Sequence, residues 1–249
     1  MKRFLALLLA LLLPVAASAD VLLTEDLTGT VSETDYVYSY CYPQADPSDP
    51  SAAHINNFFS QLVEDAVDMQ IPSAAQSYAG SGTSKSVRIT YEVTLNNSEF
   101  FSVRVCTASR EEDEYGEAID YETWTGYTFS LVSGMTGQTS TISHILGILR
   151  SEETDEWLEE RQESRVNDAV LSLVWERIEE NPDGNPLFSS LVFEDLDFFN
   201  PDKDFWLDGD GNPVFYIEFF VPDETGESGL PRKVQLTFPI SLEEIDDAI

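Results

Sequence analysis

Residues 36–42 read Tyr-Val-Tyr-Ser-Tyr-Cys-Tyr, with a tyrosine at every second position. Because successive side chains of a strand point to opposite faces, this alternation predicts a β-strand with one aromatic face. Pro43 ends the strand. The four tyrosines, Tyr36, Tyr38, Tyr40 and Tyr42, could form a platform for a sugar or a peptide. They could equally pack on a half-buried sheet with their hydroxyls at its edge, and we favour packing.

The segment after this strand predicts an amphipathic helix. Asp49 suits the N-cap and Pro50 the first helical position. Apolar residues then recur at helical spacing from Ile55 to Val67, which gives the helix one apolar face. The pair Ile71-Pro72 is expected to end it.

The rest of the chain alternates between strand and helix patterns. Further strands are expected at residues 87–95, 100–108, 124–132, 205–207, 214–221 and 234–240, and helices at 140–149, 153–180 and 241–249. Residues 110–122 are expected to form an acidic loop. Strands on both sides of a central helical stretch predict an α+β fold, mostly an antiparallel sheet with helices packed on one face. We expect one domain over residues 36–249, preceded by an extended lead-in at 20–35.

The N-terminus has the pattern of an export signal. Lys2 and Arg3 precede an unbroken apolar run over residues 4–13, and Ala17-Ser18-Ala19 supplies the small residues of a cleavage site before Asp20. The alternative is a retained anchor, but the run is about half of the roughly 20 residues that a spanning helix needs. The sequence therefore predicts an exported protein, secreted or periplasmic, with no stable membrane span after cleavage.

The charge of the chain argues against nucleic-acid binding and favours a cationic partner. Lys and Arg number 13 against 46 Asp and Glu, for a net charge of −33, and the expected mature chain of 230 residues carries −35. Such a chain repels phosphate backbones, so we expect no nucleic-acid partner. The same field speeds association with a cationic partner and weakens with salt. With 42% hydrophobic residues the chain has enough apolar material for a core.

Cys41 and Cys106 form an even pair in a chain that is expected to be exported. Each lies in an alternating, strand-like segment. A bridge between them would close a loop of about 65 residues and stabilise the fold by about 3–4 kcal/mol on the loop-entropy model. Two buried free thiols are the alternative. We expect a structural disulfide, because nothing near either cysteine suggests an activated thiolate.

The sequence offers one weak candidate for a metal site. Asp208, Asp210 and Asn212 have the first three spacings of a calcium loop. Pro213 stands where that loop needs glycine, and Phe219 stands where it needs a bidentate glutamate. A hairpin turn is therefore the better interpretation.

Candidate catalytic residues are equally weak. His54 and His144 could each serve as a base, but isolated histidines in helices are usually ordinary surface or core residues. Gly80-Ser81-Gly82 lacks the spacing of a nucleophile elbow. Any two of the 46 carboxylates could be assigned as the acid and the nucleophile of a glycosidase, so their presence does not distinguish an enzyme from another protein. The sequence therefore predicts no catalytic residues and no cofactor.

Several short segments, taken in order, resemble a known family. They are Tyr42-Pro43-Gln44, Ile55-Asn56, Tyr127–Leu131, Gly134–Gln138, Ser143–Leu149, Phe205-Trp206-Leu207, Asp210-Gly211, Val214-Phe215-Tyr216, Gly229 and the strand at 234–240. This order is similar to that of RsiV-like extracytoplasmic domains, which include the non-catalytic N-terminal domain of peptidoglycan deacetylases of the PdaC type. The likeness spans residues 36–245.

The resemblance implies a secreted or surface α+β module, and in RsiV such a domain binds lysozyme. This sequence shows no sigma-binding segment and no deacetylase domain, so signalling of the RsiV type is not expected. We expect an exported, non-catalytic binding module for a basic cell-wall hydrolase such as lysozyme or for another cell-envelope component. The alternative is a secreted hydrolase that acts on the cell wall.

Overall fold

The computed structural model describes residues 20–131, 139–147, 156–181, 184–221 and 232–249. The expected signal peptide, with Ala19 at its end, and the turn at 134–138 lie outside the described residues. Asp20 is the first described residue and is exposed.

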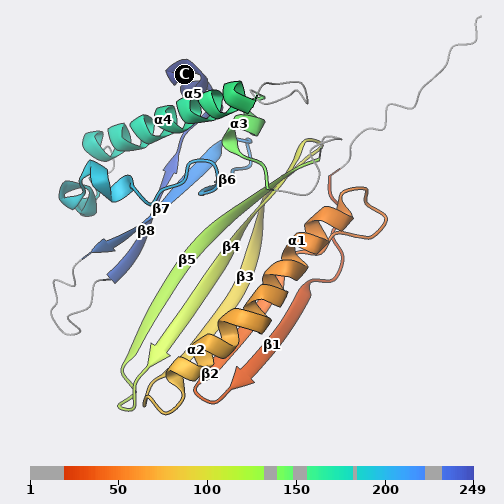
Figure 1. Ribbon diagram of the computed structural model, residues 1–249, viewed down its shortest axis with the longest axis vertical. Coiled ribbons are helices and arrows are strands. Elements are labelled where there is room, and N and C mark those ends of the chain that lie inside the picture. Colours follow the sequence, from red (N-terminus) through yellow and green to blue (C-terminus); the bar gives the residue numbers. More distant parts are fainter. Residues whose placement is uncertain (1–19, 132–138, 148–155, 182–183, 222–231) are drawn as a thin grey trace, which may run out of the picture.

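A five-stranded sheet forms the larger part of the fold, in the order β1-β2-β3-β4-β5 (Figure 1). Its strands are β1 (Leu27–Glu33), β2 (Tyr36–Tyr42), β3 (Ser84–Asn96), β4 (Phe100–Glu112) and β5 (Ala118–Ser130). All neighbouring pairs are antiparallel except β2 and β3, which are parallel. The prediction of a mostly antiparallel α+β fold is confirmed.

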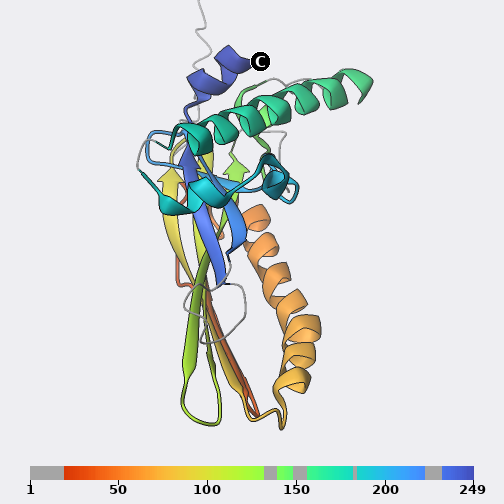
Figure 2. The same ribbon diagram turned by 90° about the vertical axis from the view of Figure 1, so that its left-hand side faces the viewer.

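One helical layer covers one face of this sheet. Helix α1 (Ala52–Asp65) runs through a π-helical turn (Ala66–Gln70) into α2 (Ile71–Tyr78), and Figure 2 shows this layer beside the sheet. The layer returns the chain from the end of β2 to the opposite end of the sheet. For this reason β3 starts in the same direction as β2, as a parallel pair requires.

The predicted helix end at Ile71-Pro72 is wrong. The N–H of Ile71 donates to the carbonyl of Ala66, five residues back, which is the hydrogen bond of a π-turn. Pro72 follows this wider turn directly, as the second residue of α2. The chain therefore stays helical through the proline.

Two other expectations at the sheet need correction. The lead-in at 20–35 is extended, but its second half is strand β1, which pairs with β2 over seven residues. The acidic segment 110–122 is mostly strand as well, because β4 runs to Glu112 and β5 begins at Ala118. Only residues 113–117 form a loop.

A second, three-stranded antiparallel sheet in the order β6-β7-β8 follows. Its strands are β6 (Phe205–Leu207), β7 (Pro213–Val221) and β8 (Arg232–Pro239). Helices α4 (Glu156–Glu180) and α5 (Leu242–Ala248) lie against it (Figure 1), and α3 (Ile142–Ile145) packs on α4. Two 3₁₀ turns, Pro186–Ser190 and Phe193–Leu196, precede β6. Ser241 and Glu244 cap α5 reciprocally, as the sequence predicts.

The buried apolar side chains form two clusters. In the first, Phe59 of α1 stacks on Tyr42, with ring centroids 5.4 Å apart, and the β3 and β4 side chains complete the layer. In the second, Phe215 and Phe205 of the small sheet pack beneath Val170 and Val174 of α4. Each sheet thus buries apolar side chains against its own helices.

The small sheet meets the large sheet at β5, and its strand β6 also reaches β4. The N–H of Gly126 donates to the Tyr216 hydroxyl over 3.2 Å. The Gln235 amide accepts from the Trp124 N–H (2.8 Å) and donates to the Trp124 carbonyl (2.6 Å). A Cβ at Gly126 would lie 1.9 Å from the carbonyl oxygen of Phe205, so only glycine permits this approach.

We expect Gly126→Ala to destabilise the protein by about 3 kcal/mol, because the added methyl meets backbone that cannot move aside without breaking the junction. Urea unfolding followed by fluorescence measures the loss. Gly209→Ala is the matched control, since nothing lies within 4 Å of a Cβ there, and its stability should match that of the unmodified protein. Equal stability of the two variants would contradict the role of Gly126.

Candidate functional site

The loop between β4 and β5 is a short turn held by its own hydrogen bonds. The Asp113 carboxylate accepts from the N–H groups of Tyr115 and Glu117, both at 2.9 Å. The Asp113 N–H donates to the Glu117 carbonyl at 3.0 Å, and Gly116 takes a φ of +83°. The turn is therefore fixed before any partner arrives.

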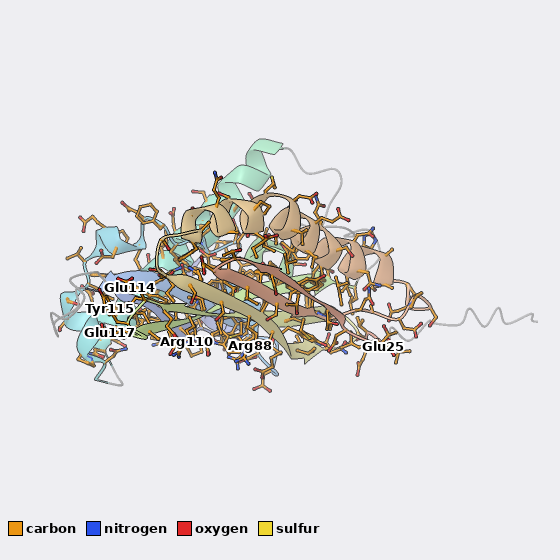
Figure 3. All side chains as sticks on the ribbon, turned by 90° about the horizontal axis from the view of Figure 1, so that it is seen from below. Glu25, Arg88, Arg110, Glu114, Tyr115 and Glu117 are labelled. Carbon is orange, nitrogen blue, oxygen red and sulfur yellow. The ribbon has the colours of Figure 1, made fainter. Side chains whose placement is uncertain are left out.

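This turn presents an aromatic side chain to solvent. Tyr115 is 83% exposed and lies between Glu114 and Glu117. Figure 3 shows these three residues together at one end of the long sheet. Tyrosine is enriched among the residues that dominate protein interfaces, because it offers a large rigid surface and a hydroxyl. We name residues 112–117 the hairpin tip.

The hairpin tip is anionic. Arg110 is the only cationic residue between 86 and 149 apart from Arg88 and Arg104, and it pairs with Glu112 and Asp120, each at 3.3 Å. Within the described part of the chain, Glu114 and Glu117 form no ion pair. These two carboxylates are thus available to a cationic partner.

The base of the hairpin is attached to the helical layer. The Glu111 carboxylate accepts from the Tyr78 hydroxyl and from Lys85 Nζ, both at 2.7 Å. The Lys85 ammonium holds the pKa of Glu111 below its usual value, and contact with Glu111 keeps the pKa of Lys85 raised despite partial burial. This half-buried cluster links the base of the hairpin to α2 and β3.

The sheet face opposite α1 and α2 is open near the hairpin. It holds a shallow depression of about 550 Å³, floored by small side chains such as Ser39 and Ala108. Arg88 and Arg110 lie on this face, and Figure 3 shows both on the side away from α1. Among the described residues Arg88 has no ion-pair partner, so the face carries a free guanidinium.

The tyrosines of β2 are core residues. Tyr36, Tyr38 and Tyr42 are buried beneath the helical layer, and burial raises the pKa of Tyr42 far above its usual value. Tyr40 is half-buried, and it crosses Gly29 of β1, where a side chain would clash with its hydroxyl. The packing interpretation is confirmed, and the ligand platform is not.

The expected disulfide is absent, because both Cys41 and Cys106 are free thiols in this structure. Cys41 lies on β2 and Cys106 on β4, with β3 between them. Strands two places apart are about 9.6 Å from each other, beyond the Cα separation of about 7 Å that a disulfide can span. Burial is the first cause that raises the pKa of each thiol, which keeps both protonated.

The remaining sequence candidates lie on separate elements of the fold. His54 lies near the start of α1, whereas His144 lies in α3, where its Nδ1 is 3.1 Å from the capping Thr141 hydroxyl. Asp208 accepts from the backbone N–H groups of Asp210 and Asn212, as in a hairpin turn. No three His, Cys, Asp or Glu side chains within the described ranges are grouped to hold a metal ion. None of the described helices is long and apolar enough to cross a membrane.

The sequence analysis did not predict the hairpin tip, because the many acidic residues of 110–122 obscure the alternation of the strand that follows the turn. Ile119, Tyr121 and Thr123 alternate with Asp120 and Glu122, which is a strand pattern. Asp113 and Gly116 supply the turn between the strands.

The fold is α+β, with two sheets each covered by helices. No protein-family model matches the sequence, and no curated protein matches it. A crystal structure of a member of the DUF3298 family from Bacteroides fragilis aligns with 93% of this chain and 98% of its own, with 14% identity and a TM-score of 0.43. This is a similarity of fold at a coarse level.

We expect Glu111→Gln to destabilise the protein by about 1 kcal/mol at pH 7, because the half-buried Lys85 loses its charged partner. The folded-state pKa of Glu111 is lowered, so its contribution is present above the unfolded pKa of about 4.5 and is lost as pH falls through the folded value. Urea unfolding should therefore show a smaller difference near pH 3 than at pH 7. The exposed Glu114→Gln should show no such loss at either pH, and a constant deficit for Glu111→Gln would contradict the ion-pair account.

Proposed function

We propose that this chain is an exported, non-catalytic binding module of the RsiV-like kind that captures a cationic protein of the cell envelope. A basic cell-wall hydrolase such as lysozyme is the specific candidate. The observation that carries the proposal is the hairpin tip, in which an exposed tyrosine stands between two unpaired carboxylates on a fixed turn.

The geometry favours binding because little order has to be created. The Asp113 hydrogen bonds already fix the turn, and the Glu111 cluster already fixes the hairpin, so association freezes few further rotamers. Tyr115 would fill an apolar pocket of the partner, while Glu114 and Glu117 would face its Lys or Arg side chains at the rim.

The field of the whole molecule acts in the same direction. A net charge of −33 attracts a basic protein over a distance of about a Debye length, roughly 10 Å at moderate salt. Long-range attraction raises the association rate, and contacts at the tip set the dissociation rate. Both effects need a cationic partner, and neither needs a reactive centre.

Calorimetric titration of the chain with lysozyme should show binding at ~20 mM salt that weakens at ~300 mM. Tyr115→Ser should weaken it by about tenfold or more at both salt concentrations, because the loss of a buried aromatic anchor is largely independent of salt. Phe198→Ser is the matched control: Phe198 is 93% exposed but lies beside the small sheet, so its removal should leave the affinity unchanged.

A charge-matched pair separates local from global electrostatics. Glu114→Gln with Glu117→Gln should reduce the affinity for lysozyme by about tenfold at low salt, whereas Asp246→Asn with Asp247→Asn on α5 should reduce it by less than about twofold. Equal losses would show that only net charge matters and would remove the hairpin tip as the site. Absence of binding at low salt would remove lysozyme as the partner.

A further inference from the structure

The two edge strands of the large sheet, β5 and β1, differ in the hydrogen bonds made by their outer backbone groups. At β5 the backbone groups of Trp124 and the N–H of Gly126 are taken by Gln235 and Tyr216 of the small sheet. At β1 no described residue other than those of β2 hydrogen-bonds to the backbone of Leu27–Glu33. The outer row of N–H and C=O groups along β1 therefore faces solvent.

Strand β1 also lacks the features that usually protect an exposed edge. Such strands are often short, bulged, or interrupted by proline or lysine. β1 pairs with β2 over seven consecutive residues without a register shift, and it contains neither proline nor lysine. Its regular edge can accept another strand.

A groove runs beside this edge, between β1 and the helical layer. It measures about 520 Å³ and is lined mainly by small and apolar side chains, from Val31 on β1 and from Val67, Ile71, Ala75 and Ala79 on the helical side. A strand added to β1 would point every second side chain into this groove, since side chains alternate across a sheet. Apolar side chains of moderate size suit the lining.

The negative charge of the segments around the β1 edge favours a cationic strand as the partner. Residues 20–84, which supply β1, β2, α1 and α2, contain no Lys or Arg. They contain ten carboxylates, namely Asp20, Glu25, Asp26, Glu33, Asp35, Asp46, Asp49, Glu64, Asp65 and Asp68. A second copy of this chain would bring the same charges against them, at a cost that rises with proximity. A cationic strand would be attracted by them.

We propose that the outer edge of β1 binds an extended, cationic segment of another protein by strand addition. The backbone of the segment pairs with β1 over up to seven residues, and alternate apolar side chains enter the groove beside α2. Its Lys or Arg side chains lie in the field of the ten carboxylates. This surface is separate from the hairpin tip, so the inference does not rest on the lysozyme proposal.

The probe is a capped peptide of four Lys-Val repeats, used with the full chain. Strand addition exposes only one alternate set of peptide N–H groups to β1. N-methylation of one alternate set should therefore weaken binding by at least tenfold, and methylation of the other set should change it by less than about threefold. Amide hydrogen exchange should show new protection within β1. Equal effects of the two methylation patterns would overturn the proposal, because a purely electrostatic complex does not distinguish them.

Substitution within the groove tests its role without a change of charge. Ala75→Gln places a longer side chain in the groove and should weaken the peptide by at least tenfold. Ala53→Gln, on an exposed position of α1, is the matched control and should bind as the unmodified chain does. Tyr115→Ser should also bind the peptide normally, which separates this site from the tip. Concentration-dependent dimerisation that protects β1 in the absence of peptide would instead identify a second copy as the occupant and would overturn the proposal.

Discussion

The contact between the small sheet and the middle of β5 is the constraint on which the rest of the structure depends. The backbone of β6 approaches Gly126 so closely that no side chain fits between them, and Gln235 replaces a neighbouring strand as the partner of Trp124. This contact fixes the two sheets to each other without merging them. It also occupies the outer edge of β5 at Trp124 and Gly126.

The position of the junction explains why the hairpin tip is free. The small sheet contacts β5 near its middle, at residues 124–126, and reaches β4 where the Ser102 hydroxyl accepts from the Leu207 N–H at 3.0 Å. The other end of the β4–β5 ribbon continues past the small sheet (Figure 2). That end pairs with β3 up to Glu112, and Glu111 also contacts Tyr78 of α2 and Lys85 of β3. The turn at residues 113–117 therefore lies beyond the small sheet and is exposed to solvent.

The sequence predicts the fold well where one signal dominates. Alternating tyrosines specify β2, and the apolar spacing of Ile55 to Val67 specifies α1, because each pattern has a single period. It fails where two signals compete. The carboxylates of 110–122 look like a loop although the alternation of a strand lies beneath them, and Pro72 looks like a helix end although a π-turn accommodates it. The disulfide prediction failed for another reason. The parallel crossover places β3 between the strands that carry Cys41 and Cys106, and no local sequence pattern encodes this order.

That crossover also explains how acidity is distributed. The first 65 described residues pass from β1 to β2, over the sheet as α1 and α2, and only then into β3. A segment without Lys or Arg therefore builds one edge and one cover of the sheet. The cations Arg88, Arg104 and Arg110 lie on β3 and β4, where Arg104 stacks on Trp124 at 4.3 Å and pairs with Glu92. Topology thus separates an anionic edge and tip from a mixed-charge central face. Separated charge of one sign orients a molecule during encounter. For this reason the proposed cationic partner would approach the β1 edge, with its unpaired backbone groups, and the hairpin tip, with its exposed Tyr115.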